Sequence, residues 1–176
     1  MTIEEACAGA VVMSDNTAAN LLLEIQGGPE GFTRFLRANG DGVTRLDRYE
    51  IELNDVPPGD ERDTTTPEAM ARMLQRFLLE GGVLASAHRE MLIGWMVESP
   101  TGRERLRAGF PSDWRVGDKT GTWTAEHNAT NDVAIAWPPG RAPILIASYL
   151  AASEVDLPAR NAAHAEIARI ITEEWG

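Results

Sequence analysis

The sequence predicts an α+β fold in which a helical part precedes a small antiparallel sheet and a closing helix. Apolar residues recur at helical spacing up to about residue 109, and strand-like runs separated by turn-forming residues follow from Trp114. With 176 residues, of which 43% are hydrophobic, the chain is long enough for one sizeable core. We therefore expect a helical subdomain over residues 1–109 and a sheet with its helix over residues 110–176.

Three stretches predict the helices. Pro67 suits a first helical position, and the apolar stripe behind it runs until Gly81 and Gly82 stop it. A second stripe follows Ser86, and two shorter stripes separated at residues 27–29 predict a helical hairpin. The residues of these stripes are expected to form core: Leu21, Leu22, Ile25, Phe32, Phe35, Leu36, Met70, Met73, Leu74, Phe77, Leu78, Met91, Leu92, Trp95 and Met96.

The second part predicts three strands, over residues 114–122, 133–137 and 144–150, with short connections typical of an antiparallel meander. A final amphipathic stripe predicts a helix packed on one face of this sheet, through Ala163, Ile167, Ile170 and Ile171. The apolar run at residues 144–147 would be an exposed edge unless another strand paired with it, so the sheet is expected to be incomplete.

The composition argues against two classes of partner. A net charge of −11 and a pI near 4.7 disfavour nucleic acid and anionic membrane surfaces, and a small-molecule role fits better. No apolar run is long enough to span a membrane, and the first residues lack the pattern of a signal peptide, so the chain as written is expected to stay where it is made. His88, His127 and His164 show no metal-ligand spacing, so neither a metal nor a cofactor is expected.

Three short segments contain residues that could perform chemistry. Residues 14–16 (Ser-Asp-Asn) would alone be read as a helix cap, and residues 119–122 (Lys-Thr-Gly-Thr) as polar residues on an edge strand. Residues 50–54 (Glu-Ile-Glu-Leu-Asn) lie in an irregular insert of about residues 45–65, where a charged turn is the ordinary explanation. Each segment alone is a weak signal.

Taken together and in this order, the segments resemble the Ser-Asp-Asn and Lys-Thr-Gly motifs of class A serine β-lactamases, with a glutamate between them. The resemblance covers nearly the whole chain. It implies a β-lactamase/transpeptidase-like fold, with residues 45–65 as an Ω-type loop. It also implies hydrolysis of the β-lactam amide bond through a serine acyl-enzyme, without a cofactor.

The resemblance assigns the acid–base roles. Glu50 would activate the hydrolytic water as general base, and Asn54 would be the second partner that fixes the direction of that water. Ser14 would pass a proton to the departing ring nitrogen, while Lys119 holds the Ser14 hydroxyl. Deacylation would therefore depend on Glu50 and Asn54.

The resemblance also assigns substrate contacts. Asn16 would bind the side-chain amide of the substrate, and the backbone N–H of Thr122 would supply half of the oxyanion hole. The hydroxyls of Thr120 and Thr122, on either side of Gly121, would bind the β-lactam carboxylate. Arg105 matches the position of the cation that some family members place nearby, although a solvated helix residue is the alternative interpretation.

Two features of the insert also follow from the resemblance. Arg48 and Asp63 would form the ion pair that closes the loop carrying Glu50. The family often has a proline in a cis peptide after this glutamate, so we expect a cis bond between Glu50 and Ile51 although Ile51 is not proline. Trp123 either walls the substrate pocket or covers the hairpin.

The family's nucleophile motif, Ser-x-x-Lys, does not occur in the 176 residues, so the chain alone is expected to be inactive. By resemblance, the motif lies in a segment before Met1, which would also supply two strands and a partner for Cys7; a free thiol is the other reading of Cys7. The parent enzyme would be periplasmic or secreted. Partners would be a β-lactam, the missing segment and a second copy paired through the exposed strand edge.

Two other functions remain open. A penicillin-binding peptidase relative would share the serine-containing triplet and the Lys-Thr-Gly motif, but Glu50 and Asn54 argue against it. A non-catalytic truncated or complementation fragment, which associates through its open sheet edge, is the other alternative.

Overall fold

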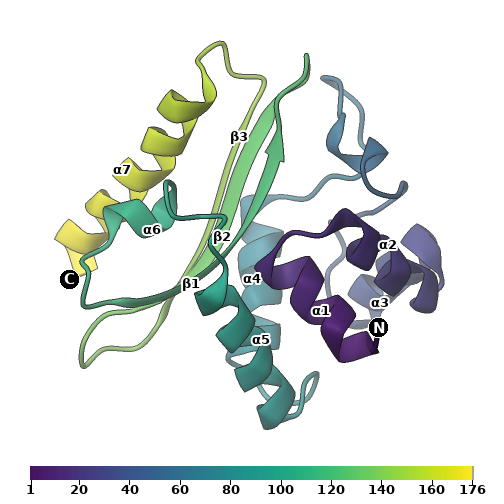
Figure 1. Cartoon of the computed structure of the whole chain (residues 1–176), viewed down its shortest axis with the longest axis horizontal. Helices are drawn as coiled ribbons and strands as arrows, with labels where there is room; N and C mark the ends of the chain where they lie inside the picture. The colour runs from purple at the N-terminus through teal and green to yellow at the C-terminus, as the bar shows by residue number, and fades with distance from the viewer. Residues whose placement is uncertain (176) are drawn as a thin grey trace.

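The computed structural model describes residues 1–175 and has the α+β fold that the sequence predicts. A three-stranded sheet lies between α6 and α7 on one face and the remaining helices on the other (Figure 1). The elements in chain order are α1 (Ile3–Val12), α2 (Asn16–Ile25), α3 (Gly28–Ala38), the short 3₁₀ helix η1 (Glu52–Asn54), α4 (Pro67–Leu78), α5 (Ser86–Glu98), α6 (Leu106–Gly109), β1 (Arg115–Trp123), β2 (Ala129–Trp137), β3 (Ile144–Ala151) and α7 (Leu157–Trp175).

Polar side chains fix where several helices begin. Thr2 and Glu5 form a reciprocal capping box at α1, and Asp15 caps α2 by accepting from the Ala18 N–H at 3.0 Å. Thr66 caps α4, and Pro67 occupies its first turn, where the missing N–H costs nothing. The two starts that the sequence marked, the cap at residues 14–16 and Pro67, are therefore the starts of α2 and α4.

The sheet is an antiparallel meander in the order β1-β2-β3. Strand β2 begins at Ala129, so the expected start at residue 133 was wrong. Residues 129–132 are mostly polar and break the apolar pattern, yet they pair with residues 120–123 of β1, and Thr130 and Asp132 are fully buried. A prediction from apolar residues alone therefore misses the first part of β2, because polar residues are buried there.

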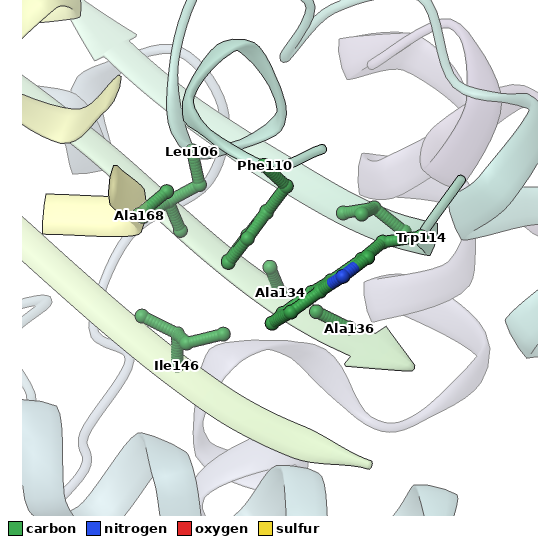
Figure 2. Packing of buried hydrophobic residues seen from close by; sticks show 8 residues of the cluster. Leu106, Phe110, Trp114, Ala134, Ala136, Ile146 and Ala168 are labelled. Atoms are coloured by element: carbon green, nitrogen blue, oxygen red, sulfur yellow. The ribbon is translucent and has the colours of Figure 1, made fainter. Parts of the chain in front are cut away.

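One face of the sheet packs against α6 and α7. Its core contains Val116, Ala134, Ala136 and Ile146 from the strands and Leu106, Phe110, Trp114 and Ala168 from the covering segments. Figure 2 shows the Phe110 and Trp114 side chains beside Ala134 and Ala136, with the two rings stacked 5.2 Å apart. A Cβ at Gly109 would lie 1.9 Å from the carbonyl oxygen of Ala165, so only glycine allows α6 to approach α7 this closely.

The opposite face packs against α4 and α5, because the side chains of a strand alternate between its two faces. This second core is formed by Leu74, Leu78, Ile93, Met96 and Ile135. The helical layer continues through α1, which packs on α2 and α5. Residues 39–66, between α3 and α4, contain the irregular insert and its only helical turn, η1.

Apolar side chains remain exposed at the ends of this arrangement. Strand β3 is an outer strand of the sheet, and exposed apolar residues lie on α1 (Ile3) and on α7 (Ile167, Ile170 and Trp175). The expected packing of Ile167 and Ile170 on the sheet was therefore wrong, because α7 turns His164, Ala165 and Ala168 inward instead. The expected core positions Leu21 and Ile25 on α2 are exposed as well. Cys7 is half-buried, and burial raises the pKa of its thiol. None of the helices in residues 1–175 combines the length and the apolar character needed to cross a membrane.

A polar layer is buried between the sheet and α7. The His164 ring lies between the carbonyl oxygen of Thr130, at 2.9 Å from Nε2, and the Ser148 hydroxyl, at 2.7 Å from Nδ1. Because a carbonyl can only accept, Nε2 donates and Nδ1 accepts from Ser148, which satisfies a neutral ring. Burial lowers the pKa of His164 in agreement with this neutral form.

Two buried carboxyl groups lie on the same face of the sheet. Asp118 pairs with Arg107, whereas Asp132 accepts only the Leu106 N–H, at 3.1 Å, and its Oδ1 has no hydrogen-bond partner among residues 1–175. Burial, together with repulsion from Asp118, raises the pKa of Asp132 to about 8. Asp132 is therefore protonated at neutral pH in the folded chain.

The substitution Asp132→Asn should stabilise the fold in a pH-dependent way. Above pH ~4 an unfolded chain releases the Asp132 proton that the folded chain retains, so this group lowers the stability increasingly up to pH ~8. The variant should gain roughly 1–3 kcal/mol at pH 8 and almost nothing at pH 4. Urea unfolding at pH 4, 6 and 8 measures this, with the exposed Asp113→Asn as control. An equal gain at every pH would contradict the assignment.

Candidate functional site

A pocket of about 220 Å³ lies where the outer strand β1 meets the α1–α2 corner and the insert. The expected residues Ser14, Asn16, Glu50, Asn54 and the segment 119–122 all line it. The remaining lining residues are Ala10, Asp15, Ala19, Ile51 and Trp123. Segments that are far apart in the sequence therefore form one concave, polar site.

Ser14 and Lys119 form a direct contact in this pocket. Lys119 Nζ donates to Ser14 Oγ at 2.8 Å and to the Thr120 carbonyl oxygen at 2.7 Å. Because an ammonium group has only donors, the Ser14 hydroxyl accepts here and keeps its own proton available. Burial lowers the pKa of Lys119, while the charge of Glu50 opposes that shift.

The geometry of the Ser14 segment follows from the cap of α2. Ser14 has a φ of 56°, a left-handed conformation that is uncommon for a residue other than glycine. It directly precedes Asp15, whose side chain caps the helix, so the turn that starts α2 also positions the Ser14 hydroxyl toward Lys119. The same turn therefore lets Asp15 cap α2 and places Ser14 and Asn16 in the pocket.

Glu50 and Asn54 form a second bonded pair in the same pocket. Asn54 Nδ2 donates to Glu50 Oε2 at 2.5 Å and also to the carbonyl oxygen of Ile51 at 3.1 Å. The Glu50–Ile51 peptide is cis, as expected. Asn20 on α2 holds the Glu50 backbone in both directions, accepting from its N–H at 2.9 Å and donating to its carbonyl at 3.0 Å. The Glu50 carboxylate is therefore positioned directly by Asn54 and indirectly by Asn20, which fixes the Glu50 backbone.

The insert is closed by an ion pair at its base. Arg48 Nε lies 2.6 Å from Asp63 Oδ2, and the Asp63 side chain is 1% exposed. The other carboxylate oxygen of Asp63 accepts the N–H groups of Asp47 and Arg48 at 2.7 and 3.0 Å. Removal of either charge would leave a buried partner unsatisfied, which is costly.

Arg105 lies behind the pocket rather than in it. Its side chain is buried, so the interpretation as a solvated helix residue is wrong. Nη2 donates to Thr122 Oγ1 at 2.5 Å, and Nη1 donates to the carbonyl oxygens of Gly121 and Asn131 at 2.9 and 2.7 Å. Since Thr122 accepts from Arg105, its own hydroxyl proton is free to point elsewhere.

Sequence reasoning missed several residues around the site. Besides Asn20, these are Asn161, which accepts from Arg105 Nε at 2.9 Å, and Thr101, which accepts from the Thr120 hydroxyl at 2.9 Å. Each belongs to an element distant in sequence from its partner, and no local pattern marks it. Trp123 lines the pocket, in agreement with the first of its two interpretations.

The histidines do not form a metal site. His164 is in the core and His88 is exposed, whereas His127 contacts Asp55 of the insert at 2.9 Å. Within residues 1–175, no group of three or more His, Cys, Asp or Glu side chains could hold a metal ion.

Comparison with known proteins gives a consistent result. The profile of the "Beta-lactamase enzyme family" matches residues 1–175. Beta-lactamase AST-1 of Nocardia asteroides is 51% identical over 176 residues, which cover 100% of this chain and 56% of that protein. The carbapenem-hydrolyzing beta-lactamase KPC of Klebsiella oxytoca is 47% identical, with coverage of 100% and 59%. The chain thus spans little more than half the length of these relatives.

Solved structures agree with the sequence matches. The ancestral (GNCA) beta-lactamase class A superimposes with a TM-score of 0.96 at 57% identity, covering 99% of this chain and 66% of that one. A beta lactamase from Xanthomonas campestris gives a TM-score of 0.95 at 47% identity, covering 100% and 65%. On its sequence, its fold and its extent of similarity, the chain belongs to the class A β-lactamase family.

Proposed function

We propose that this chain is the larger part of a hydrolase that opens the amide bond of β-lactams through a serine acyl-enzyme. The observation that supports this most is that one pocket is lined both by the bonded pair Glu50 and Asn54 and by the bonded pair Ser14 and Lys119. The chain would supply the deacylation base and the substrate-binding wall. The nucleophilic serine would come from a Ser-x-x-Lys segment outside these 176 residues.

In this proposal, Glu50 removes a proton from the water that attacks the acyl-enzyme. Asn54 donates to one oxygen of the Glu50 carboxylate, so the other oxygen can accept from a water while the Asn54 carbonyl oxygen gives that water a second partner. The bond from Asn20 to the Glu50 backbone limits movement of the base. A penicillin-binding peptidase would not require this pair.

Ser14 would deliver the proton to the ring nitrogen as the amide bond breaks. Its hydroxyl accepts from Lys119, which leaves its proton directed at an acceptor in the pocket. The lowered pKa of Lys119 makes its ammonium group a better donor of the proton that Ser14 later regains. Asn16 would bind the side-chain amide of the substrate from the same side.

The strand segment 119–122 would bind the reacting carbonyl and the carboxylate. As β1 is an outer strand, alternate N–H groups of its backbone point away from β2, and the Thr122 N–H would form half of the oxyanion hole. The Thr122 hydroxyl would donate to the carboxylate, and the Thr120 hydroxyl would do so after turning from Thr101, to which it donates in the free chain. Arg105 would act from behind, through Thr122, both as a hydrogen-bond donor and as a buried positive charge.

The whole protein's organisation is also a proposal. Residues 1–109 would act as a helical subdomain and residues 110–176 as the sheet subdomain, with the pocket between them. The parent enzyme would be periplasmic or secreted, and the outer strand β3 would pair with the missing segment or, without it, with a second copy. Neither nucleic acid nor a membrane is expected as a partner, given the net charge of −11.

Complementation tests the main proposal. The chain alone should not turn over nitrocefin, whereas the chain combined with the part of AST-1 that it does not match should do so, because that part would supply Ser-x-x-Lys. The same AST-1 part with its motif serine changed to alanine is the control. Turnover by the chain alone would disprove the absence of a nucleophile, and no turnover by the combination would favour the non-catalytic fragment.

The substitution Glu50→Gln should stop the reaction after acylation in the complemented enzyme. Loss of a general base typically slows its step by roughly 10²–10⁴-fold, so the acyl-enzyme should accumulate while acylation continues. Mass spectrometry of the protein after mixing with benzylpenicillin measures the adduct. The exposed neighbour Glu52→Gln should turn over normally. If Glu50→Gln lost acylation instead, the assigned role would be wrong.

The substitution Arg105→Ala should weaken binding of the substrate carboxylate. Because Arg105 fixes the Thr122 hydroxyl and supplies positive charge, KM should rise by about tenfold, the effect of losing ~1.4 kcal/mol of binding. Steady-state kinetics with benzylpenicillin checks this, with the exposed Arg103→Ala as control and thermal unfolding to verify folding. A fall in kcat at unchanged KM would argue for a purely structural role.

A further inference from the structure

One contact joins the hairpin between β1 and β2 to the insert beside the pocket. His127 Nδ1 and Asp55 Oδ1 lie 2.9 Å apart, and they come from segments 72 residues apart in the sequence. The turn after β1 and the loop around η1 run close to each other in this region (Figure 1). The two segments are also the two rims of the pocket, since Trp123 and Asn54 both line it.

The contact is distinctive because the tip of the insert has few other attachments. Asn20, Arg48 and Asp63 hold the base of the insert or join two parts of it. Of the side-chain hydrogen bonds formed by the described residues, only the one with His127 joins residues 51–62 to a residue outside the insert; the others link them to Glu50, Arg48 and Thr64 within it. A segment with so few contacts opens locally at low cost, so one contact can decide its position.

Asp55 directly follows Asn54, which donates to Glu50. A shift of Asp55 would displace Asn54 and so the two groups that hold the hydrolytic water. The Asp55 side is fixed as well, because its carbonyl oxygen accepts from Arg48 Nη2 at 3.0 Å. The Asn54–Asp55 turn is therefore held from within the insert by Arg48 and from outside the insert by His127 of the hairpin.

The pair itself contributes little to overall stability. The side chains of His127 and Asp55 are 28% and 47% exposed, and pairs that are this open to solvent add little to the free energy of unfolding. A contact that is too weak to hold the fold together can still select one position of a loop. Its effect should therefore appear in the geometry of the pocket rather than in the unfolding temperature.

We propose that His127 and Asp55 form a strap that holds the insert against the β1–β2 hairpin and keeps Glu50 and Asn54 aligned on the hydrolytic water. His127 is then a positioning residue for deacylation, an inference that rests on the proposed function. It touches neither the substrate nor the reacting atoms. Its effect would reach Glu50 through the peptide bond between Asp55 and Asn54 and the hydrogen bond from Asn54 to Glu50.

The substitution His127→Ala in the complemented enzyme tests the strap by kinetics. Slower deacylation lowers kcat and KM together, because the acyl-enzyme accumulates, and leaves kcat/KM unchanged. We expect kcat and KM to fall by about tenfold each, less than the loss of the base itself. His127→Gln, which retains a side-chain N–H donor, should recover most of kcat. The exposed neighbour Glu126→Ala should leave kcat and KM unchanged.

Hydrogen–deuterium exchange provides a second readout that does not need catalysis. In His127→Ala, the amides of residues 51–56 should exchange faster than in the unaltered protein, and those of α4 and α5 should not. Unchanged exchange in residues 51–56 would overturn the strap. A fall in kcat/KM at constant KM would also overturn it, because that pattern marks loss of active protein.

Failure of the strap and failure of the proposed function give different results. If the unaltered complemented enzyme does not turn over substrate, the proposed function is wrong, and the deacylation role of His127 with it. If it does turn over substrate and His127→Ala behaves like Glu126→Ala, the strap alone is wrong.

Discussion

The position of β1 as an outer strand between two helical layers is the constraint on which the site depends. Side chains of a strand alternate, so Lys119 points to the face covered by α5 and meets Ser14, while Thr120 and Thr122 point to the face occupied by Arg105. The free backbone edge between them faces the pocket. A shift of one residue in the pairing with β2 would exchange these faces and separate Lys119 from Ser14.

The carboxylate side of the pocket is built differently, because it lies in a loop without a ladder of backbone hydrogen bonds. Individual polar ties replace that ladder: Asn20 holds the Glu50 backbone, and the Arg48–Asp63 pair closes the base. The tip has the weaker contact between Asp55 and His127. A wall built on a strand and a wall built on a loop therefore meet at one pocket, which fits the proposed reaction, in which water would have to enter after acylation.

The sequence predicted the elements whose patterns are local. The stripes behind Pro67 and Ser86 became α4 and α5, and the three strands and the closing helix appear in the expected order. The predicted start of β2 was wrong because Thr130 and Asp132 are polar but buried by tertiary contacts, and polar residues do not extend an apolar strand pattern. Arg105 was left undecided for the same reason, since its partners in β1, β2 and α7 are distant in sequence.

The sequence by itself determined which groups are available: the Ser-Asp-Asn and Lys-Thr-Gly segments, the glutamate of the insert, and the lack of a Ser-x-x-Lys pair in these residues. Residue types and their order are a property of the chain, and a family resemblance can be read from them. Only the tertiary structure decided how the groups are held. The contacts of Asn20, Asn161 and His127 join residues 30, 56 and 72 positions apart, and long-range contacts of this kind exist only after the chain has folded.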